Sequence, residues 1–325
     1  MENVTLTKRI FGSKIFPLLV IFAGVVVLFT AIKPDYIRST DNIRGILNSM
    51  SLSGTIGVGM ACLLIGGGVD LSAGAVGCFA GVIVAMLIKS GMPWGFALVI
   101  AMLLGGALGA FNAFLINGLN FTGFIATIGV SSMLQGLTLV ITRSQNVAIN
   151  NDSFFLLGKL AFFKVLTLPF IIMVVLLVIY GIILSRTRFG RTIYMCGGNR
   201  MAARMSGLSP KKVTTILYVN CSMLSALGGS ILAARMHSGS PTAVVGRELD
   251  AITAAVLGGV SFMGGSGSML GCFVGLLLLN SFNNGLAFVG VKSYWTIVAQ
   301  GALLIVALVI DYLNQRAQQE KLKQD

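Results

Sequence analysis

SRTRFGRTIYMCGGNRMAARMSGLSPKKV, residues 185–213, is the longest clearly polar segment in a chain that is otherwise largely apolar. It contains seven basic residues and no acidic residue. Basic residues concentrate on the cytoplasmic side of inner-membrane proteins, because they resist translocation. The segment is therefore predicted to face the cytosol, and the rest of the chain can be oriented from it.

Local signals within this segment predict a short helix. Asn199 can cap a helix and Gly207 suits the left-handed residue that ends one, with reasonable helix formers between them. Ser209 and Pro210 then predict the start of a second helix, which runs into the membrane. Residues four apart are neighbours on a helix, so the short helix should present an apolar strip beside a basic strip. The strips are Met201 with Met205 and Arg200 with Arg204. This pattern indicates a surface that docks on another protein.

The composition excludes a water-soluble globular protein. Of the 325 residues, 56% are hydrophobic and only 10% are charged, which indicates a polytopic membrane protein. The net charge of +13 falls in the gaps between apolar segments, so cytoplasmic basic loops explain it better than nucleic-acid binding. The five cysteines form no C-x-x-C pair and His237 is the sole histidine. A metal site, a disulfide framework and a histidine-based catalytic site are therefore not expected.

A membrane-spanning helix needs about 20 apolar residues, and this measure predicts about ten spans, two or three of them short. They cover residues 16–32, 43–65, 74–88, 93–116, 122–142, 165–184, 213–234, 250–263, 267–289 and 293–312. An even number puts both termini on one side, and basic residues near both termini place that side in the cytosol. These are Lys8, Arg9, Lys14, Arg316, Lys321 and Lys323. The predicted fold class is an all-α polytopic membrane protein with both termini cytoplasmic. It is a single permease domain over residues 1–325, with external loops at 143–164 and 235–249.

Glycines are unusually frequent, with 41 in the chain. Small residues let membrane helices approach closely, and three G-x-x-x-G pairs predict such packing, namely 77/81, 105/109 and 271/275. The sequence also contains a faint internal repeat, because residues 67–81 and 258–275 share a Gly-Gly-Val start and a Gly-Cys-Phe-x-Gly end. Internal repeats are common in transport folds.

Asp70, in the sequence LIGGGVDLSAGAV, is the one charged residue between Arg44 and Lys89. An acid at membrane depth is a candidate functional site. Three roles stay open: an N-cap of the following span with help from Ser72, a structural brace, or a proton or cation site. Non-helical backbone at that depth must be buried in protein or line a wet cavity. The stretch is therefore expected to lie near the working centre.

Neutral polar residues inside the spans could line a path for an uncharged polyhydroxyl solute, and a phenylalanine could stack on a sugar face. Interhelical hydrogen bonding explains most of these polar residues equally well. The residues selected for the path, or for bracing it, are Asp70, Ser72, Asn112, Phe124, Thr127 and Asn283. In the second external loop, Glu248 and Asp250 could cap the next helix.

Six ordered motifs resemble the membrane-spanning permease of ribose-, xylose- and galactose-type ABC importers, within the superfamily of branched-chain amino-acid permeases. They are GGGVDLSAGA (66–75), NAFLING (112–118), GFIATIGV (123–130), TRFGRTIYMCGGNRMAARMSG (187–207), SGSPTAVVGRELDAITAAVLGGVSFMGGSGSMLG (238–271) and NNGLAFVGV (283–291). The resemblance implies a type II ABC importer-like fold. It also implies a non-catalytic inner-membrane subunit that translocates a small neutral solute, foremost a monosaccharide such as ribose.

The resemblance further implies the partners. A cytosolic ABC ATPase would bind ATP and Mg, so no cofactor is expected on this chain. An extracytoplasmic sugar-binding protein would deliver the solute, and a second permease copy, identical or paralogous, would complete the path within membrane lipid. The positions that match the family's ATPase coupling segment are Arg188, Gly190, Arg191, Gly198, Asn199, Arg200, Ala202, Ala203, Arg204, Ser206 and Gly207. The positions expected to face the binding protein are Arg235, Ser238, Arg247, Glu248 and Asp250.

Two alternative functions stay open. The chain could be an ion-coupled secondary transporter that uses Asp70, or an ABC permease for a non-sugar solute. The scarcity of other intramembrane acids argues against ion coupling, since proton relays usually need several. The sequence contains no P-loop and no nucleophile with an evident base, so it is not expected to hydrolyse ATP by itself.

Overall fold

The computed structural model describes residues 16–163 and 165–322, and most of them are helical. The basic N-terminal residues Lys8, Arg9 and Lys14, together with Lys164 and Lys323, lie outside the described residues. The long helices are α2 (Phe16–Ile32), α4 (Thr40–Ile65), α5 (Ala73–Lys89), α6 (Trp94–Asn117), α7 (Gly123–Thr142), α9 (Leu168–Arg186), α12 (Pro210–Met236), α14 (Met269–Val289) and α15 (Ser293–Leu322).

Shorter elements connect the long helices. The helices among them are α3 (Asp35–Arg38), α8 (Asp152–Lys159), α10 (Arg188–Gly198), α11 (Arg200–Met205) and α13 (Arg247–Leu257). Two antiparallel strand pairs join β1 (Val147–Ala148) to β4 (Ser238–Gly239) and β2 (Ala161–Phe162) to β3 (Leu166–Thr167). The region predicted as the external loop 143–164 thus contains helix α8 and the strands β1 and β2.

Seven helices in the described part of the chain are long and apolar enough to cross a membrane: α4, α6, α7, α9, α12, α14 and α15. Helices α2 and α5 are apolar but shorter, at 17 residues each. The prediction of a helical, polytopic membrane protein is confirmed.

The stretch predicted as a span over residues 250–263 is not one continuous helix. Helix α13 has 11 residues, which at 1.5 Å per residue gives about 16 Å, roughly half of the hydrocarbon thickness. It ends at a Gly-Gly pair, where the Gly258 N–H bonds to Ala254 O and Gly259 adopts a φ of 82°. Residues 258–268 then continue without helix to α14.

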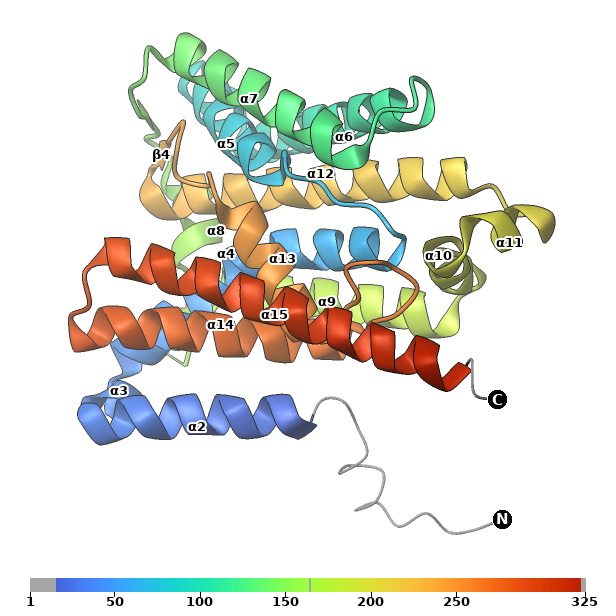
Figure 1. Ribbon diagram of the computed structural model, residues 1–325. Coiled ribbons are helices and arrows are strands. Elements are labelled where there is room, and N and C mark those ends of the chain that lie inside the picture. The colour runs from blue at the N-terminus through green and yellow to red at the C-terminus, as the bar shows by residue number, and fades with distance from the viewer. Residues whose placement is uncertain (1–15, 164, 323–325) are drawn as a thin grey trace.

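Helix α12 lies at the centre of the molecule, between α5, α6 and α7 on one side and α4, α9 and α14 on the other (Figure 1). The predicted close packing through G-x-x-x-G pairs is confirmed at this helix. A methyl group added at Gly81 would meet Gly229 O at 2.9 Å, and one added at Gly109 would meet Tyr218 O at 2.5 Å. Only glycine permits these approaches, so α5 and α6 contact the backbone of α12 directly.

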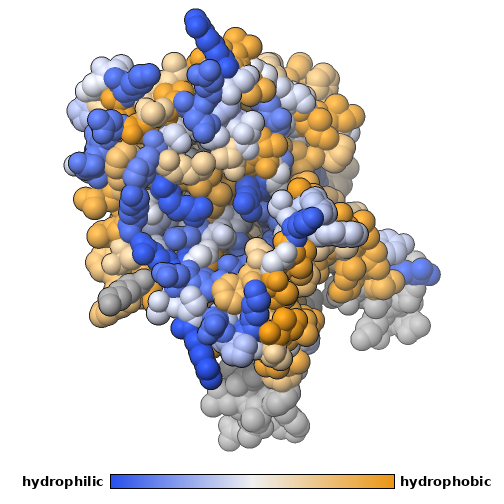
Figure 2. Space-filling view, turned by 90° about the vertical axis from the view of Figure 1, so that its left-hand side faces the viewer, coloured by the Kyte–Doolittle hydropathy of each residue, from blue (hydrophilic) through white to orange (hydrophobic). Residues whose placement is uncertain are grey.

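The two ends of the molecule differ. Helices α10 and α11 lie at one end, together with the end of α15, and the start of α2 points towards that end, whereas α3, α8 and β4 lie at the other (Figure 1). We call these the α10 end and the α8 end. Figure 2 looks onto the α8 end and shows hydrophilic side chains gathered across that face, with apolar atoms around its margin.

Candidate functional site

The polar segment 185–213 folds into the two helices α10 and α11. The predicted caps of α11 are confirmed: Asn199 Oδ1 accepts a hydrogen bond from Ala202 N–H at 2.9 Å, and Gly207 has a φ of 78°. Ser209 precedes α12 but makes no capping bond with its side chain. Helix α10 was not predicted; it begins where Thr187 Oγ1 accepts from Gly190 N–H at 3.0 Å.

Helix α11 is attached on one face and open on the other. Ala203 is 1% exposed, whereas Met201 and Met205 are 66% and 84% exposed. Arg200 and Arg204 are exposed as well. The apolar and basic strips expected from the sequence therefore lie on an accessible surface.

Two irregular segments, residues 66–72 after α4 and residues 258–268 after α13, meet against the last turn of α10. Gly265 N–H donates to Ile65 O at 2.8 Å. A Cβ added at Gly197 would lie 1.8 Å from Ile65 O and 2.7 Å from Gly265 N. Gly67 and Gly264 adopt φ values of 75° and 93°, and a Cβ at Gly264 would meet Gly67 Cα at 2.9 Å. We call Gly67, Gly197, Gly264 and Gly265 the glycine junction.

Side chains of α10 and α11 hold both irregular segments at this junction. Tyr194 donates its hydroxyl hydrogen to Gly267 O at 2.8 Å, and Arg200 Nη2 donates to Gly67 O at 3.2 Å. The internal repeat seen in the sequence thus brings its two glycine-rich stretches into contact. A rigid displacement of α10 would displace both stretches, because packed backbone has no free space to absorb it.

Asp70 lies in the first irregular segment and is fully buried. Its Oδ1 accepts hydrogen bonds from the Ser72 N–H at 2.9 Å and the Ser72 hydroxyl at 2.5 Å. Its Oδ2 accepts from the Ser222 hydroxyl of α12 at 3.1 Å. Asn112 Nδ2 of α6 donates to Ser72 Oγ at 2.8 Å and lies 3.5 Å from Asp70 Oδ1. Asp70 therefore ties the irregular segment to α6 and α12.

The expected N-cap role of Asp70 is wrong. The residue at the N-cap position of α5 is Ser72, and its side chain makes no capping bond. The contacts of Asp70 are those of the structural brace. The described partners of Asp70 are neutral donors, and they satisfy both of its buried oxygens within the protein.

Hydrogen bonds connect Asp70, Ser72 and Asn112 but not the other residues predicted for the path. Phe124 lies on α7 and is 60% exposed. Thr127 is buried, and its hydroxyl donates to Gly123 O of its own helix at 2.8 Å. Asn283 lies on α14, where its Oδ1 is buried without a partner in the described part of the chain.

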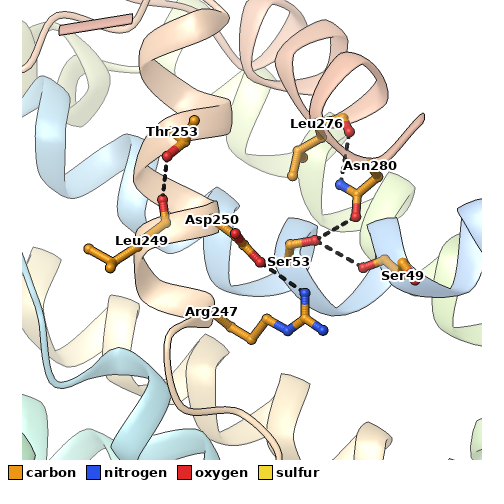
Figure 3. Close-up of polar contacts among 8 residues, drawn as sticks. All are labelled: Ser49, Ser53, Arg247, Leu249, Asp250, Thr253, Leu276 and Asn280. Atoms are coloured by element: carbon orange, nitrogen blue, oxygen red, sulfur yellow. Dashed lines mark hydrogen bonds and ion pairs between the residues drawn. The ribbon is translucent and has the colours of Figure 1, made fainter. Parts of the chain in front are cut away.

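The residues predicted to face a binding protein lie towards the α8 end. Arg247 Nη1 pairs with Asp250 Oδ2 at 2.9 Å within the first turn of α13 (Figure 3). Asp250 is 8% exposed, so its carboxylate is largely unavailable to a docked protein. Both acids lie in the first turn of α13, and the Glu248 carboxylate accepts hydrogen bonds from the backbone N–H groups of Gly246 and of Glu248 itself, so Glu248 contributes to capping the helix as predicted.

The remaining members of this set also make internal contacts. Glu248 packs its carboxylate against Gly74 of α5, where an added Cβ would lie 2.0 Å from Oε2. Arg235 Nη1 donates to Asn48 O of α4 at 3.1 Å, and Ser238 belongs to β4. Beside this group, the Ser53 hydroxyl and Asn280 Oδ1 connect α4 to α14 at 3.2 Å (Figure 3). These contacts therefore connect α12 to α4, α13 to α5, and α4 to α14.

A family model described as "branched-chain amino acid transport system / permease component" matches residues 42–308. The chain belongs to this permease family. The match includes the brace at Asp70, the glycine junction and both helices of the polar segment. This permease is a multi-pass protein of the inner membrane.

Three relatives of this permease match over most of their length. The ribose import permease protein RbsC of Bacillus subtilis (strain 168) is 36% identical over 301 residues, which are 92% of each chain. The D-allose transport system permease protein AlsC of Escherichia coli (strain K12) is 33% identical over 297 residues, 90% of each chain. The L-arabinose transport system permease protein AraH of the same strain is 33% identical over 302 residues, 93% of this chain and 92% of AraH. No solved structure gives a significant match.

Proposed function

We propose that this permease is the non-catalytic membrane subunit of an ABC importer and that it translocates a monosaccharide such as ribose. The relatives that match it over nine tenths of their length carry the names of ribose, allose and arabinose permeases. The polar groups inside its helices are mostly hydroxyls and amides, which suit an uncharged polyhydroxyl solute. ATP and Mg would bind to a separate cytosolic ATPase.

The observation that carries this proposal is the contact of α10 and α11 with both irregular segments at the glycine junction. An ATPase docked on the open face of α11 would move the two helices as a unit. Gly197, Tyr194 and Arg200 would pass that movement to residues 66–72 and 258–268. Coupling of this kind requires contacts that differ between the two nucleotide states of the ATPase.

The proposed topology places the α10 end, and with it both termini, in the cytosol, in accordance with the basic segment 185–213. About ten crossings result if α2, α5 and the stretch formed by α13 with residues 258–268 each count as one. The sugar-binding protein would dock on the hydrophilic α8 end (Figure 2). A second permease copy would complete the path in the membrane.

Two alternatives are kept. Asp70 could serve ion coupling, although its described partners are neutral donors that already occupy both oxygens. The solute could also be other than a sugar, as the description of the family allows.

Copurification and uptake test the proposal together. The wild-type chain should copurify with a P-loop ATPase from its native membrane, and uptake into proteoliposomes should require ATP and that partner. Met205→Glu should abolish copurification, because a charge replaces an apolar side chain on the open face of α11, while the exposed position leaves folding intact. Met236→Glu, at the α8 end, is the control and should copurify normally. Uptake by the lone chain, driven by a proton or sodium gradient, would overturn the proposal.

A further inference from the structure

A cavity of about 640 Å³ lies beside α11 at the α10 end. Its walls come from residues 67–69, from the connection between α6 and α7, and from α11 and α12. Three basic side chains line it, namely Arg200, Arg204 and Lys211. Neutral hydrogen-bonding groups line the remaining polar wall, among them Asn117, Asn120, Thr122, Thr214 and Tyr218.

None of the residues that line this cavity is acidic. Two acids contact its wall segments without lining it. Asp70 follows Val69 and is already bonded by Ser72 and Ser222, and Asp311 accepts from the Phe262 N–H at 3.0 Å. The Arg204 side chain makes no hydrogen bond or ion pair with any described residue, although the backbone oxygen of Arg204 accepts from the Gly207 N–H at 3.0 Å. Three cations thus share one cavity without a counter-charge in its lining, an arrangement that an anion would stabilise.

Hydrogen bonds fix two of the cations at the cavity wall. Lys211 Nζ donates to Asn117 O at 2.7 Å, and Asn117 Nδ2 donates in return to Lys211 O at 3.1 Å. Arg200 Nη2 donates to Gly67 O at 3.2 Å. An ammonium group has three donors and a guanidinium group has five, so most of their donors stay available to a ligand.

We propose that this cavity binds a phosphate group. Arginine forks and lysine ammonium groups recognise phosphate through charge-assisted hydrogen bonds, and the cavity volume is that of small-molecule sites. The phosphate has two possible sources, a soluble phosphate compound or the headgroup of an anionic phospholipid. Phe121 and Phe124, which are 51% and 60% exposed beside the basic residues, provide an apolar surface for the rest of either ligand.

Occupation of the site would bear on the glycine junction. Arg200 reaches both the cavity and Gly67 O, so a bound phosphate would hold α11 against the first irregular segment. Binding itself does not depend on the transport function proposed above and can be measured on the full-length chain alone. A negative result would leave the importer proposal untouched.

The experiment uses the full-length chain in lipid nanodiscs with two separate readouts. In discs of neutral phosphatidylcholine, equilibrium binding of radiolabelled inorganic phosphate is measured. In discs that contain phosphatidylglycerol, native mass spectrometry records how many phosphatidylglycerol molecules stay on the protein. Lys211→Gln and Arg204→Gln should each weaken one of these signals about tenfold or more, the expected loss for a charge-assisted contact. High salt should also weaken the binding signal of the wild type, because ions screen the charges.

Lys212→Gln is the matched control, because Lys212 is the exposed neighbour of Lys211 and does not line the cavity. It should bind like the wild type. Arg204→Gln keeps the test decisive if Lys211→Gln misfolds, because the exposed Arg204 side chain forms no hydrogen bond or ion pair with the described residues that the substitution would remove. A loss confined to inorganic phosphate identifies a soluble ligand, and a loss confined to phosphatidylglycerol identifies a lipid headgroup. Equal binding in all variants, or an equal loss in Lys212→Gln, would overturn the proposal.

Discussion

Asp70 shows how one residue determines the position of three chain segments. Its carboxylate receives donors from the irregular segment and from α12, and it shares Ser72 with Asn112 of α6. A buried acceptor of this kind is costly to remove, because its donors would be left without partners in a medium that offers no water.

The first prediction concerns the stability of this brace. Asp70→Asn keeps the shape and part of the bonding and should lower the free energy of unfolding by about 1–2 kcal/mol, whereas Asp70→Leu should cost about 3 kcal/mol or more. Ser222→Ala should cost about 1 kcal/mol, because it removes the tie to α12. Thermal unfolding in detergent measures the order of these effects.

Ser225→Ala is the control for Ser222→Ala, since the Ser225 hydroxyl donates only within α12, to Cys221 O. Equal melting temperatures for the two serine variants would contradict the brace. Wild-type stability of Asp70→Asn combined with a complete loss of gradient-driven uptake would instead support ion coupling.

Among the elements, the close approach of α10 to the two irregular segments is expected to determine both stability and uptake. Gly197→Ala should impair uptake severely and lower the melting temperature, because the added Cβ would fall 1.8 Å from Ile65 O and backbone cannot easily move away. Gly198→Ala is the neighbouring control, as its Cβ would meet Gly265 Cα at an ordinary 3.7 Å. Uptake assays and thermal unfolding of both variants provide the comparison. Near-equal behaviour of the two would show that the glycine junction is not tightly packed.

The elements also show what the sequence could and could not predict. Hydropathy located the long helices, and Asn199 and Gly207 located α11, because both signals are local. Helix α10 was not predicted because three glycines weaken its helical signal. Contacts with other elements stabilise it instead, as the burial of Ile193 and Cys196 shows, each of which is 1% exposed. The helix predicted over residues 250–263 extends beyond Leu257, where α13 ends, because apolar residues continue past that point. The contacts of Asp70 could not be deduced, since Ser222 lies 152 residues away in the chain.

The molecule as a whole has two chemically different ends, and their orientation can be tested by labelling. The five native cysteines are buried, and burial raises the pKa of the Cys196 thiol, an effect that Arg200 only partly offsets. Background reaction with maleimide should therefore be low. Leu156→Cys, on α8 and 56% exposed in the wild type, should react with a membrane-impermeant maleimide in intact cells. Met205→Cys should react only after permeabilisation, and the reverse pattern would refute the proposed topology.

The brevity of α13 has a consequence for biogenesis. Insertion machinery sorts segments by apolar length, and an 11-residue helix followed by irregular backbone does not qualify as an independent crossing. Yet α12 finishes at the α8 end and α14 starts towards the α10 end (Figure 1), so in the proposed topology residues 247–268 traverse the bilayer between them. Their exposed peptide groups need protein partners, such as Ile65 O for the Gly265 N–H. We infer that this stretch enters the membrane late, after α4 and α14 have been inserted. A chain truncated before α14 should therefore leave α13 outside the membrane, where a membrane-impermeant protease could cleave it.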